Sequence, residues 1–219
     1  MYKDTQKSSA KNLILQHIKE AKVSNAVWTP SDFFKLGSRE AVDKALQRMV
    51  AEGILRRIDR GLYDQLHVNK LTGLLTTPDY QQIIAAIGRR NQVRILIDGI
   101  TAANALGLTN AVPGQIIVRT EGQIRPIRIG NLTIQFKITA PSRLYWAGRP
   151  AMYIVQALYW LRDTLKNDTH MTSEVKTKLI RLLKNPQQGK QLCDDLKTGL
   201  HTVPLWMQRW IEELLSTTE

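Results

Sequence analysis

The N-terminal fold is decided by the stretch Trp28–Asp64, which reads WTPSDFFKLGSREAVDKALQRMVAEGILRRIDRGLYD. Within it, Thr29 followed by Pro30 predicts the start of a short helix, because threonine caps helices and proline fits their first turn. Gly37 ends this helix, and Ser38 caps a longer helix that follows directly. The stretch therefore begins with two consecutive helices joined by a tight turn.

The longer helix is amphipathic and is ended by Gly53. Its apolar residues recur at helical spacing on one face, at Ala41, Val42, Ala45, Leu46, Met49 and Val50. Its other face carries Arg39, Glu40, Asp43, Lys44, Gln47 and Arg48. On its own, this pattern favours an ordinary solvent-exposed face over one that reads DNA.

A basic hairpin follows the longer helix. Ile54–Ile58 is predicted to form a strand, Asp59–Gly61 a tight turn and Leu62–Tyr63 the returning strand. Its three arginines are Arg56, Arg57 and Arg60. A further helix is expected upstream, from near Ser9, where apolar residues recur at helical spacing. The order of helix, short helix, capped helix and basic hairpin is the plan of a winged helix-turn-helix over residues 1–65.

In a winged helix, the third helix enters the major groove of DNA and the hairpin, or wing, reaches phosphates or the minor groove. The wing arginines stand where this plan requires cations, and arginine or glutamine on the helix can read base edges. Winged helices also serve as protein-interaction modules. The pattern therefore favours DNA binding and leaves a protein partner as the alternative.

The charge balance also indicates an anionic partner. The chain has 219 residues, with 31 lysines and arginines against 19 acidic residues, and a net charge of +12. Nucleic acid is the first expectation, and an acidic protein or a membrane surface is a weaker one. The 43% hydrophobic content is that of a globular protein, so disorder is excluded as the general state of the chain.

The compartment is predicted from what the sequence lacks. The N-terminal residues MYKDTQKSSAKN have no apolar core of a secretory signal peptide, and no apolar run is long enough for a membrane span. Cys193 is the one cysteine, which excludes an internal disulfide framework and a multi-cysteine zinc site. We therefore expect a cytoplasmic protein that has no membrane partner.

Residues 66–140 are predicted to form a mixed region, with a linker over 66–77, a helix from Pro78 and a strand over Val93–Ile97. Three further strand candidates are Gln115–Thr120, Ile124–Ile129 and Leu132–Ile138. Because Gly130 and Asn131 make a typical hairpin turn, we expect a small antiparallel sheet. Pro126 marks the second of these candidates as an edge strand.

Six arginines of this region are candidates for a second basic surface. They are Arg89, Arg90, Arg94, Arg119, Arg125 and Arg128. One interpretation is that they extend the DNA footprint, and the other is that they only keep the protein soluble. Solubilising charge is slightly favoured, because their spacing does not show that they converge.

Residues 141–219 read as a bundle of helices. A helix opened by Pro150 is apolar almost all round, so we expect it at the centre of the bundle. Trp206 and Trp210 lie on one face of the last helix, and they belong to the core unless either ring is exposed to a partner. The expected fold class is α+β: a winged helix over 1–65, then a second domain over 66–219 with a small antiparallel sheet and a C-terminal helical bundle.

No catalytic constellation is present in the sequence. It has no phosphate-binding glycine loop of either common type and no serine nucleophile elbow. The four histidines, His17, His67, His170 and His201, lack the spacing of metal ligands. Cys193 is followed by two aspartates, which disfavour a reactive thiolate. We therefore expect a protein that is not an enzyme and uses no cofactor or metal.

The N-terminal stretch contains the motifs Trp28-x-Pro30, Gly37-Ser38-Arg39, Ala45-Leu46-x-Arg48-Met49, Gly53-x-Leu55-Arg56-Arg57 and Arg60-Gly61-Leu62-Tyr63. In these motifs the chain resembles AbiEi-type antitoxins and related transcriptional regulators. The segment GITAANALGL over Gly99–Leu108 and the motif Pro204-x-Trp206-Met207 extend it along most of the chain.

This resemblance implies the antitoxin half of a type IV toxin–antitoxin operon in bacteria. The winged helix would bind repeats in the promoter of its own operon and repress it, and the C-terminal region would oppose a nucleotidyltransferase-like toxin. Carried over onto this sequence, with Thr29 added at the start of the short helix, the candidate contacts to double-stranded DNA are Thr29, Ser38, Arg39, Lys44, Gln47, Arg48, Arg56, Arg57 and Arg60. Arg48 lies near the apolar face, so the alternative for it is to brace the wing.

Two other functions remain open at this point. The chain is a protein-interaction module whose C-terminal helices bind a partner, or it is a transcriptional repressor that has no toxin. The sequence also leaves open whether a monomer binds each of two repeats or a dimer binds one palindrome.

Overall fold

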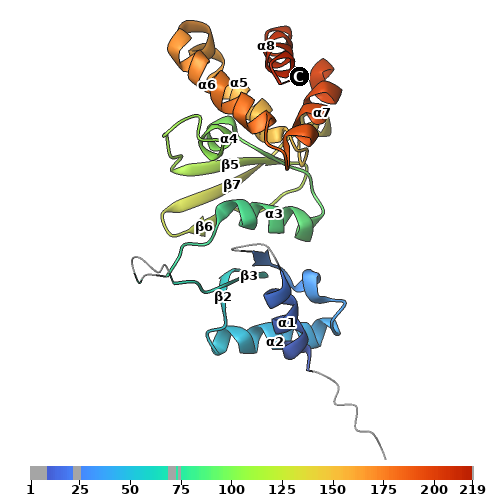
Figure 1. Cartoon of the computed structure of the whole chain (residues 1–219). Helices are drawn as coiled ribbons and strands as arrows, with labels where there is room; N and C mark the ends of the chain where they lie inside the picture. Colours follow the sequence, from blue (N-terminus) through green and yellow to red (C-terminus); the bar gives the residue numbers. More distant parts are fainter. Residues whose placement is uncertain (1–8, 22–25, 69–72, 74, 219) are drawn as a thin grey trace, which may run out of the picture. The chain divides into compact units, whose positions relative to one another are not determined.

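The computed structural model describes residues 9–21, 26–68, 73 and 75–218 (Figure 1). These residues contain eight α-helices and two sheets, of three and four strands, so the predicted α+β class is confirmed. The chain divides into two compact units, Met1–Gln92 and Val93–Glu219. None of the described helices is long and apolar enough to cross a membrane.

The helices of the first unit begin at the predicted caps. They are α1 (Ala10–Glu20), the 3-10 helix η1 (Pro30–Phe33) and α2 (Arg39–Ala51). The Ser38 hydroxyl accepts a hydrogen bond from the amide of Ala41 at 3.3 Å, as expected of the residue that caps α2. At the start of η1, the amide of Thr29 donates to Asp32 Oδ2 at 2.7 Å.

A three-stranded antiparallel sheet completes this unit. Its strands are β1 (Val27–Trp28), β2 (Leu55–Asp59) and β3 (Leu62–Gln65), in the order β1-β3-β2. β2 and β3 form the predicted hairpin, and Asp59 is the partner of Leu62 across a turn of Arg60 and Gly61. Gly61 has a φ of 68°, in the left-handed region where a residue without a Cβ is favoured.

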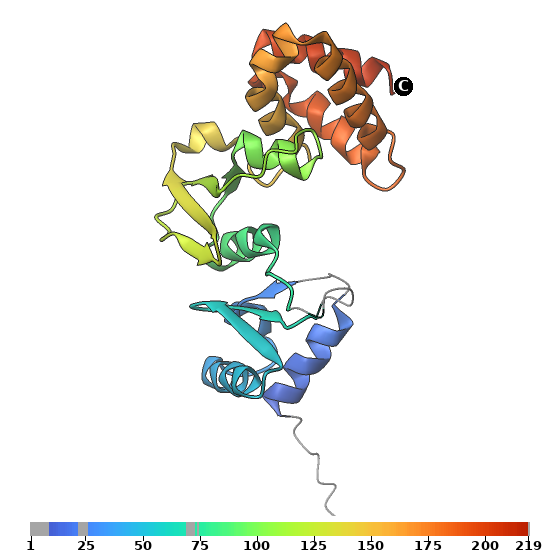
Figure 2. The same cartoon turned by 90° about the vertical axis from the view of Figure 1, so that its left-hand side faces the viewer.

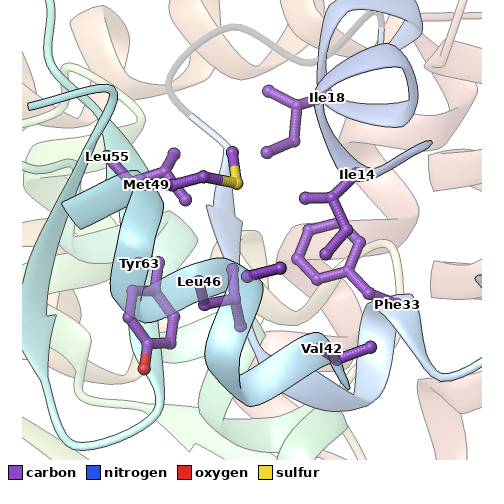
Figure 3. Packing of buried hydrophobic residues seen from close by; sticks show 9 residues of the cluster. Ile14, Ile18, Phe33, Val42, Leu46, Met49, Leu55 and Tyr63 are labelled. Carbon is purple, nitrogen blue, oxygen red and sulfur yellow. The ribbon is translucent and has the colours of Figure 1, made fainter. Parts of the chain in front are cut away.

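The hydrophobic core of this unit joins the helices to one face of the sheet (Figure 3). Its buried members are Ile14, Ile18, Phe33, Val42, Ala45, Leu46, Met49, Leu55 and Tyr63. Four of them are on the predicted apolar face of α2, which confirms that this face points inward. Each large apolar side chain that is fully buried in this way contributes about 1.5–3 kcal/mol to the free energy of folding. The packing is that of a winged helix, with the other face of α2 directed to solvent.

Helix α3 (Tyr80–Asn91) also belongs to the first unit, which therefore extends beyond the expected boundary at residue 65. It lies on the side of the small sheet that is opposite to α1 and α2 (Figures 1 and 2). A hydrogen bond of 3.0 Å from Arg89 to the carbonyl oxygen of Val27 ties it to β1. The linker expected over 66–77 lies partly outside the described residues, as does the polar N-terminal segment over 1–8.

The sheet of the second unit corrects one prediction. Its strands are β4 (Ile95–Ile97), β5 (Gln115–Thr120), β6 (Ile127–Ile129) and β7 (Leu132–Ile138), in the order β4-β5-β7-β6. β5 and β7 are parallel, so the expectation of a purely antiparallel sheet was wrong. The connection over 121–126 takes the chain to the far edge, where β6 forms the predicted hairpin with β7. As a result, β7 and not β6 pairs with β5.

Five α-helices surround or follow this sheet. They are α4 (Gly99–Ala105), α5 (Met152–Asn167), α6 (Thr169–Leu183), α7 (Gly189–Gly199) and α8 (Leu205–Ser216), with short 3-10 turns η2 (Pro141–Leu144) and η3 (Leu200–Thr202). α5 buries one face in the bundle, but Tyr159 and Trp160 are 40% and 43% exposed. The helix α5 is therefore amphipathic, because these two aromatic side chains lie on the side of the helix that faces solvent.

Candidate nucleic-acid interface

The outward face of α2 carries cations in exposed ion pairs. Lys44 lies 2.8 Å from Glu40, and Arg39 lies 4.0 Å from Asp43, both at i,i+4 spacing. All four side chains are at least 45% exposed. Exposed pairs of this kind contribute about 0–1 kcal/mol, so the cations can exchange a carboxylate for a phosphate at little expense.

Arg48 and Gln47 extend this face toward the end of α2, and both are exposed. No described residue forms an ion pair or hydrogen bond with the Arg48 guanidinium. The expected alternative for Arg48, a brace for the wing, therefore has no contact among the described residues to support it. Arg48 is instead available to a ligand on the outside of the helix.

The first wing arginine, Arg56, is held within the hairpin. Its Nε and Nη2 atoms donate to the two carboxylate oxygens of Asp64 at 3.0 and 2.6 Å, and its Nη1 donates to the carbonyl oxygen of Thr76 at 2.9 Å. The Arg56 and Asp64 side chains are only 26% and 7% exposed. Arg56 thus has a bracing role in the wing, and a contact with DNA would require this paired arrangement to open.

The other two wing arginines, Arg57 and Arg60, are exposed. No described carboxylate pairs with either guanidinium. Arg60 lies in the turn itself, one residue before Gly61. The tip of the wing therefore presents two cations to solvent, which is the arrangement expected of a hairpin that contacts phosphates.

Thr29 and Ser38 have structural roles at helix starts. Thr29 is fully buried, and its hydroxyl donates to Asp32 Oδ2 at 3.0 Å. Ser38 is exposed, although its hydroxyl already caps α2. Of these two candidates, the structure leaves only Ser38 at the surface.

Two exposed residues at the turn before α2 were not predicted from the sequence. Phe34 is 45% exposed and Lys35 is also exposed, whereas the preceding Phe33 is fully buried. The doubled phenylalanine was the available signal, because adjacent side chains of a short helix cannot both face one core. Phe34 is suited to an apolar contact, for example with a thymine methyl group.

The six arginines expected as a second basic surface are divided between the two units. Arg89 and Arg90 end α3 in the first unit, and Arg125 precedes β6. Arg94 pairs with Glu121 at 2.8 Å. Its hydrogen bonds lower the pKa of the Glu121 carboxyl, and the same contact raises the pKa of Arg94.

The remaining two arginines share a sheet face with a lysine that was not predicted from the sequence. Arg119 and Lys137 are partners in the parallel β5–β7 pair, and Arg128 is the partner of Thr133 on β6–β7. Strand alternation places these three exposed cations on the face opposite to the buried side chains of Ile116 and Ile134.

The tryptophans of α8 are half-buried, and cations from neighbouring helices cover their rings. Arg162 lies 5.9 Å from the Trp206 ring centre, and Lys176 lies 5.7 Å from that of Trp210. Among the described residues of this bundle, the large apolar side chains that are exposed are those of Tyr159, Trp160 and Leu205. Partial burial raises the pKa of the Tyr159 hydroxyl.

The acidic residues beside Cys193 serve different purposes. Asp195 is buried and forms an ion pair with Arg149 at 2.6 Å. Its carboxylate also accepts a hydrogen bond from the backbone amide of Ala151 at 2.9 Å. Asp194 is exposed. Over the part of the chain that the structure describes, no three histidine, cysteine or acidic side chains gather as metal ligands would.

The fold and this surface define an α+β protein whose first unit is a winged helix with exposed cations on α2 and on the wing. The chain belongs to DUF6088, a family of unknown function, whose model matches residues 13–191 and so covers parts of both units. A comparison with curated proteins found no match.

Proposed function

We propose that the protein is a bacterial DNA-binding autorepressor that acts as the antitoxin of a type IV toxin–antitoxin operon. One observation carries the DNA-binding part: the exposed cations Arg48, Arg57 and Arg60 on α2 and the wing have no carboxylate partner among the described residues. A polyanion such as DNA supplies the negative charge that these three cations lack as a partner. The AbiEi-like motifs between Trp28 and Tyr63, which span this same unit, support the assignment.

In this proposal, α2 lies in the major groove of double-stranded DNA and the wing follows the backbone. Gln47, Arg39 and Arg48 are the side chains suited to base edges, each good bidentate contact being worth about 1–3 kcal/mol of discrimination. Arg57 and Arg60 contact phosphates, which adds affinity without sequence preference. The exposed carboxylates of α2 are suited to the amino group of cytosine.

A gel-shift experiment with the DNA upstream of its own gene tests the DNA-binding part. The variant Arg57→Ala/Arg60→Ala should bind that DNA at least about tenfold more weakly, because two phosphates are then left without a cation. Lys190→Ala/Lys197→Ala, on α7 of the second unit, removes the same charge as a matched control. Equal affinity of the wing variant and the wild type would remove the wing from the interface.

The antitoxin part rests on the resemblance, including the segment over Gly99–Leu108 and the motif Pro204-x-Trp206-Met207. It predicts a nucleotidyltransferase-like toxin gene next to this one. Co-expression should restore growth that the toxin alone arrests. If the neighbouring product arrests growth and this chain does not relieve it, the antitoxin assignment is wrong. With no such gene present, a repressor that has no toxin is favoured.

A second candidate is a partner-binding module that uses the C-terminal helices. The observation in its favour is the exposure of Tyr159, Trp160 and Leu205 on α5 and α8. Aromatic side chains are enriched at the energetic centres of interfaces. Failure of the wild type to bind any DNA at low salt, together with co-purification of the neighbouring gene product, would favour this candidate over the repressor.

A further inference from the structure

Two consecutive arginines at the end of α3 contact different parts of the winged helix. Arg89 Nη2 donates to the carbonyl oxygen of Val27 at 3.0 Å and lies 3.4 Å from Asp32 Oδ2. Arg90 Nη1 donates to the carbonyl oxygen of Arg60 at 2.8 Å. One arginine therefore holds β1 and the start of η1, and the next one holds the turn of the wing.

The contact of Arg90 falls on the peptide group at the tip of the wing. Arg60 and Gly61 connect Asp59 to Leu62, which are partners at the end of the strand ladder. The carbonyl group of Arg60 lies in this turn, outside the strand ladder, and the hydrogen bond from Arg90 adds a contact from outside the hairpin. A guanidinium donor makes a charge-assisted hydrogen bond, which is roughly twice as strong as a neutral one.

Gly61 in the turn also lies close to residues outside the hairpin. A Cβ atom on Gly61 would lie 3.7 Å from Arg90 Nη1 and 3.8 Å from Pro30 Cδ, which are ordinary contact distances. The tip of the wing thus packs between the end of α3 and the start of η1. Its position is set by residues outside the hairpin.

We propose that Arg90 is a positioning residue of the wing. By holding the carbonyl group of Arg60, it fixes the direction in which the Arg60 side chain leaves the turn toward a DNA phosphate. This inference rests on the proposed DNA-binding function and deepens it. It makes α3 part of the DNA-binding unit, although α3 lies outside the winged-helix pattern of residues 1–65.

A double-mutant cycle on the full chain tests this role. The affinity for the duplex upstream of its own gene is measured at one salt concentration for the wild type, Arg90→Ala, Arg60→Ala and the double variant. Arg90→Ala should weaken binding about tenfold, as expected for the removal of a hydrogen bond to a charged group. In the Arg60→Ala background the same substitution should have almost no effect. Additive losses would overturn the proposal, because Arg90 would then act independently of Arg60.

Arg89→Ala is the matched control, since it removes the same side chain from the same helix without touching the turn. Its effect on binding should be additive with that of Arg60→Ala. The backbone amide signals of Arg60 and Gly61 in NMR spectra should shift in Arg90→Ala and stay in place in Arg89→Ala. Unchanged signals in Arg90→Ala would also overturn the proposal. If that variant fails to fold, Arg90→Met, which keeps an unbranched side chain but has no hydrogen-bond donor, replaces it in the cycle.

The outcomes separate this inference from the function on which it rests. If the wild type binds no DNA, the proposed function fails, and the role of Arg90 in DNA binding fails with it. If the wild type binds and Arg90→Ala binds equally well, only the role of Arg90 fails.

Discussion

Asp64 accepts two of the three hydrogen bonds that the Arg56 guanidinium donates, and its side chain is 7% exposed. Asp64→Asn keeps the shape but removes the negative charge, so the half-buried Arg56 is left without its counter-ion. We expect the free energy of unfolding of the first unit to fall by about 2 kcal/mol, since breaking one side of an enclosed pair leaves an uncompensated charge. Urea unfolding followed by the NMR amide signals of residues in the first unit measures this loss.

Asp43→Asn is the control for this substitution, because it makes the same chemical change on α2, where the side chain is 45% exposed. Its effect on stability should stay within about 0.5 kcal/mol. An equally small effect of Asp64→Asn would contradict the bracing role of Arg56. Arg56 would then again be a candidate for a DNA contact.

The Arg94–Glu121 pair makes a prediction about pH. The hydrogen bonds from Arg94 lower the pKa of the Glu121 carboxyl in the folded state below its ordinary value. The resulting stabilisation is present above that ordinary value and is lost as the pH falls through the lowered pKa. A carboxyl titration followed by NMR should find the Glu121 midpoint below the ordinary value of a glutamate carboxyl, and Arg94→Gln should raise it. An unchanged midpoint in that variant would contradict the pairing.

At the scale of elements, the contact between α4 and α5 depends on a glycine. A Cβ atom on Gly99 would lie 2.5 Å from Trp160 Cβ and 2.7 Å from the carbonyl oxygen of Gln156. Alanine normally stabilises a helix, but here it must push α4 away from α5. Gly99→Ala should therefore lower the stability of the second unit by about 1–3 kcal/mol, measured by thermal unfolding.

Gly114→Ala is the matched control for this packing prediction. A Cβ atom on Gly114 would meet nothing within 4 Å, and its φ lies outside the left-handed region. The melting temperature of this variant should equal that of the wild type or exceed it slightly. A Gly99→Ala variant as stable as the Gly114→Ala variant would show that α4 and α5 are not closely packed.

The sequence predicted those elements that local signals determine. Ser38 as a cap, the apolar face of α2 and the Arg60-Gly61 turn all lie within one short stretch, and the structure confirms each of them. The parallel pairing of β5 with β7 was missed because it depends on which distant strand fills a place in the sheet. The attachment of α3 was missed for a similar reason. It depends on the hydrogen bond from Arg89 to the carbonyl oxygen of Val27, and these two residues are far apart in the sequence.

At the scale of the whole molecule, the net charge of +12 has to be distinguished from the smaller set of cations that we propose to contact DNA. The logarithm of the affinity of a protein for DNA falls linearly with the logarithm of salt concentration, and the slope counts the phosphates that the protein neutralises. Under the proposed function each of the two wing arginines neutralises one phosphate, so Arg57→Ala/Arg60→Ala should reduce that slope by about two. Fluorescence anisotropy titrations across a salt series give the slope.

Arg119→Ala/Lys137→Ala removes the same charge from the sheet face of the second unit and therefore tests total charge against local charge. If only the first unit contacts DNA, this variant should keep the wild-type slope, because the charges that it removes neutralise no phosphate. An equal reduction by both variants would show that the second unit also lies on the DNA. A reduction by neither would mean that neither pair neutralises phosphates, and the wing would then have no part in DNA binding.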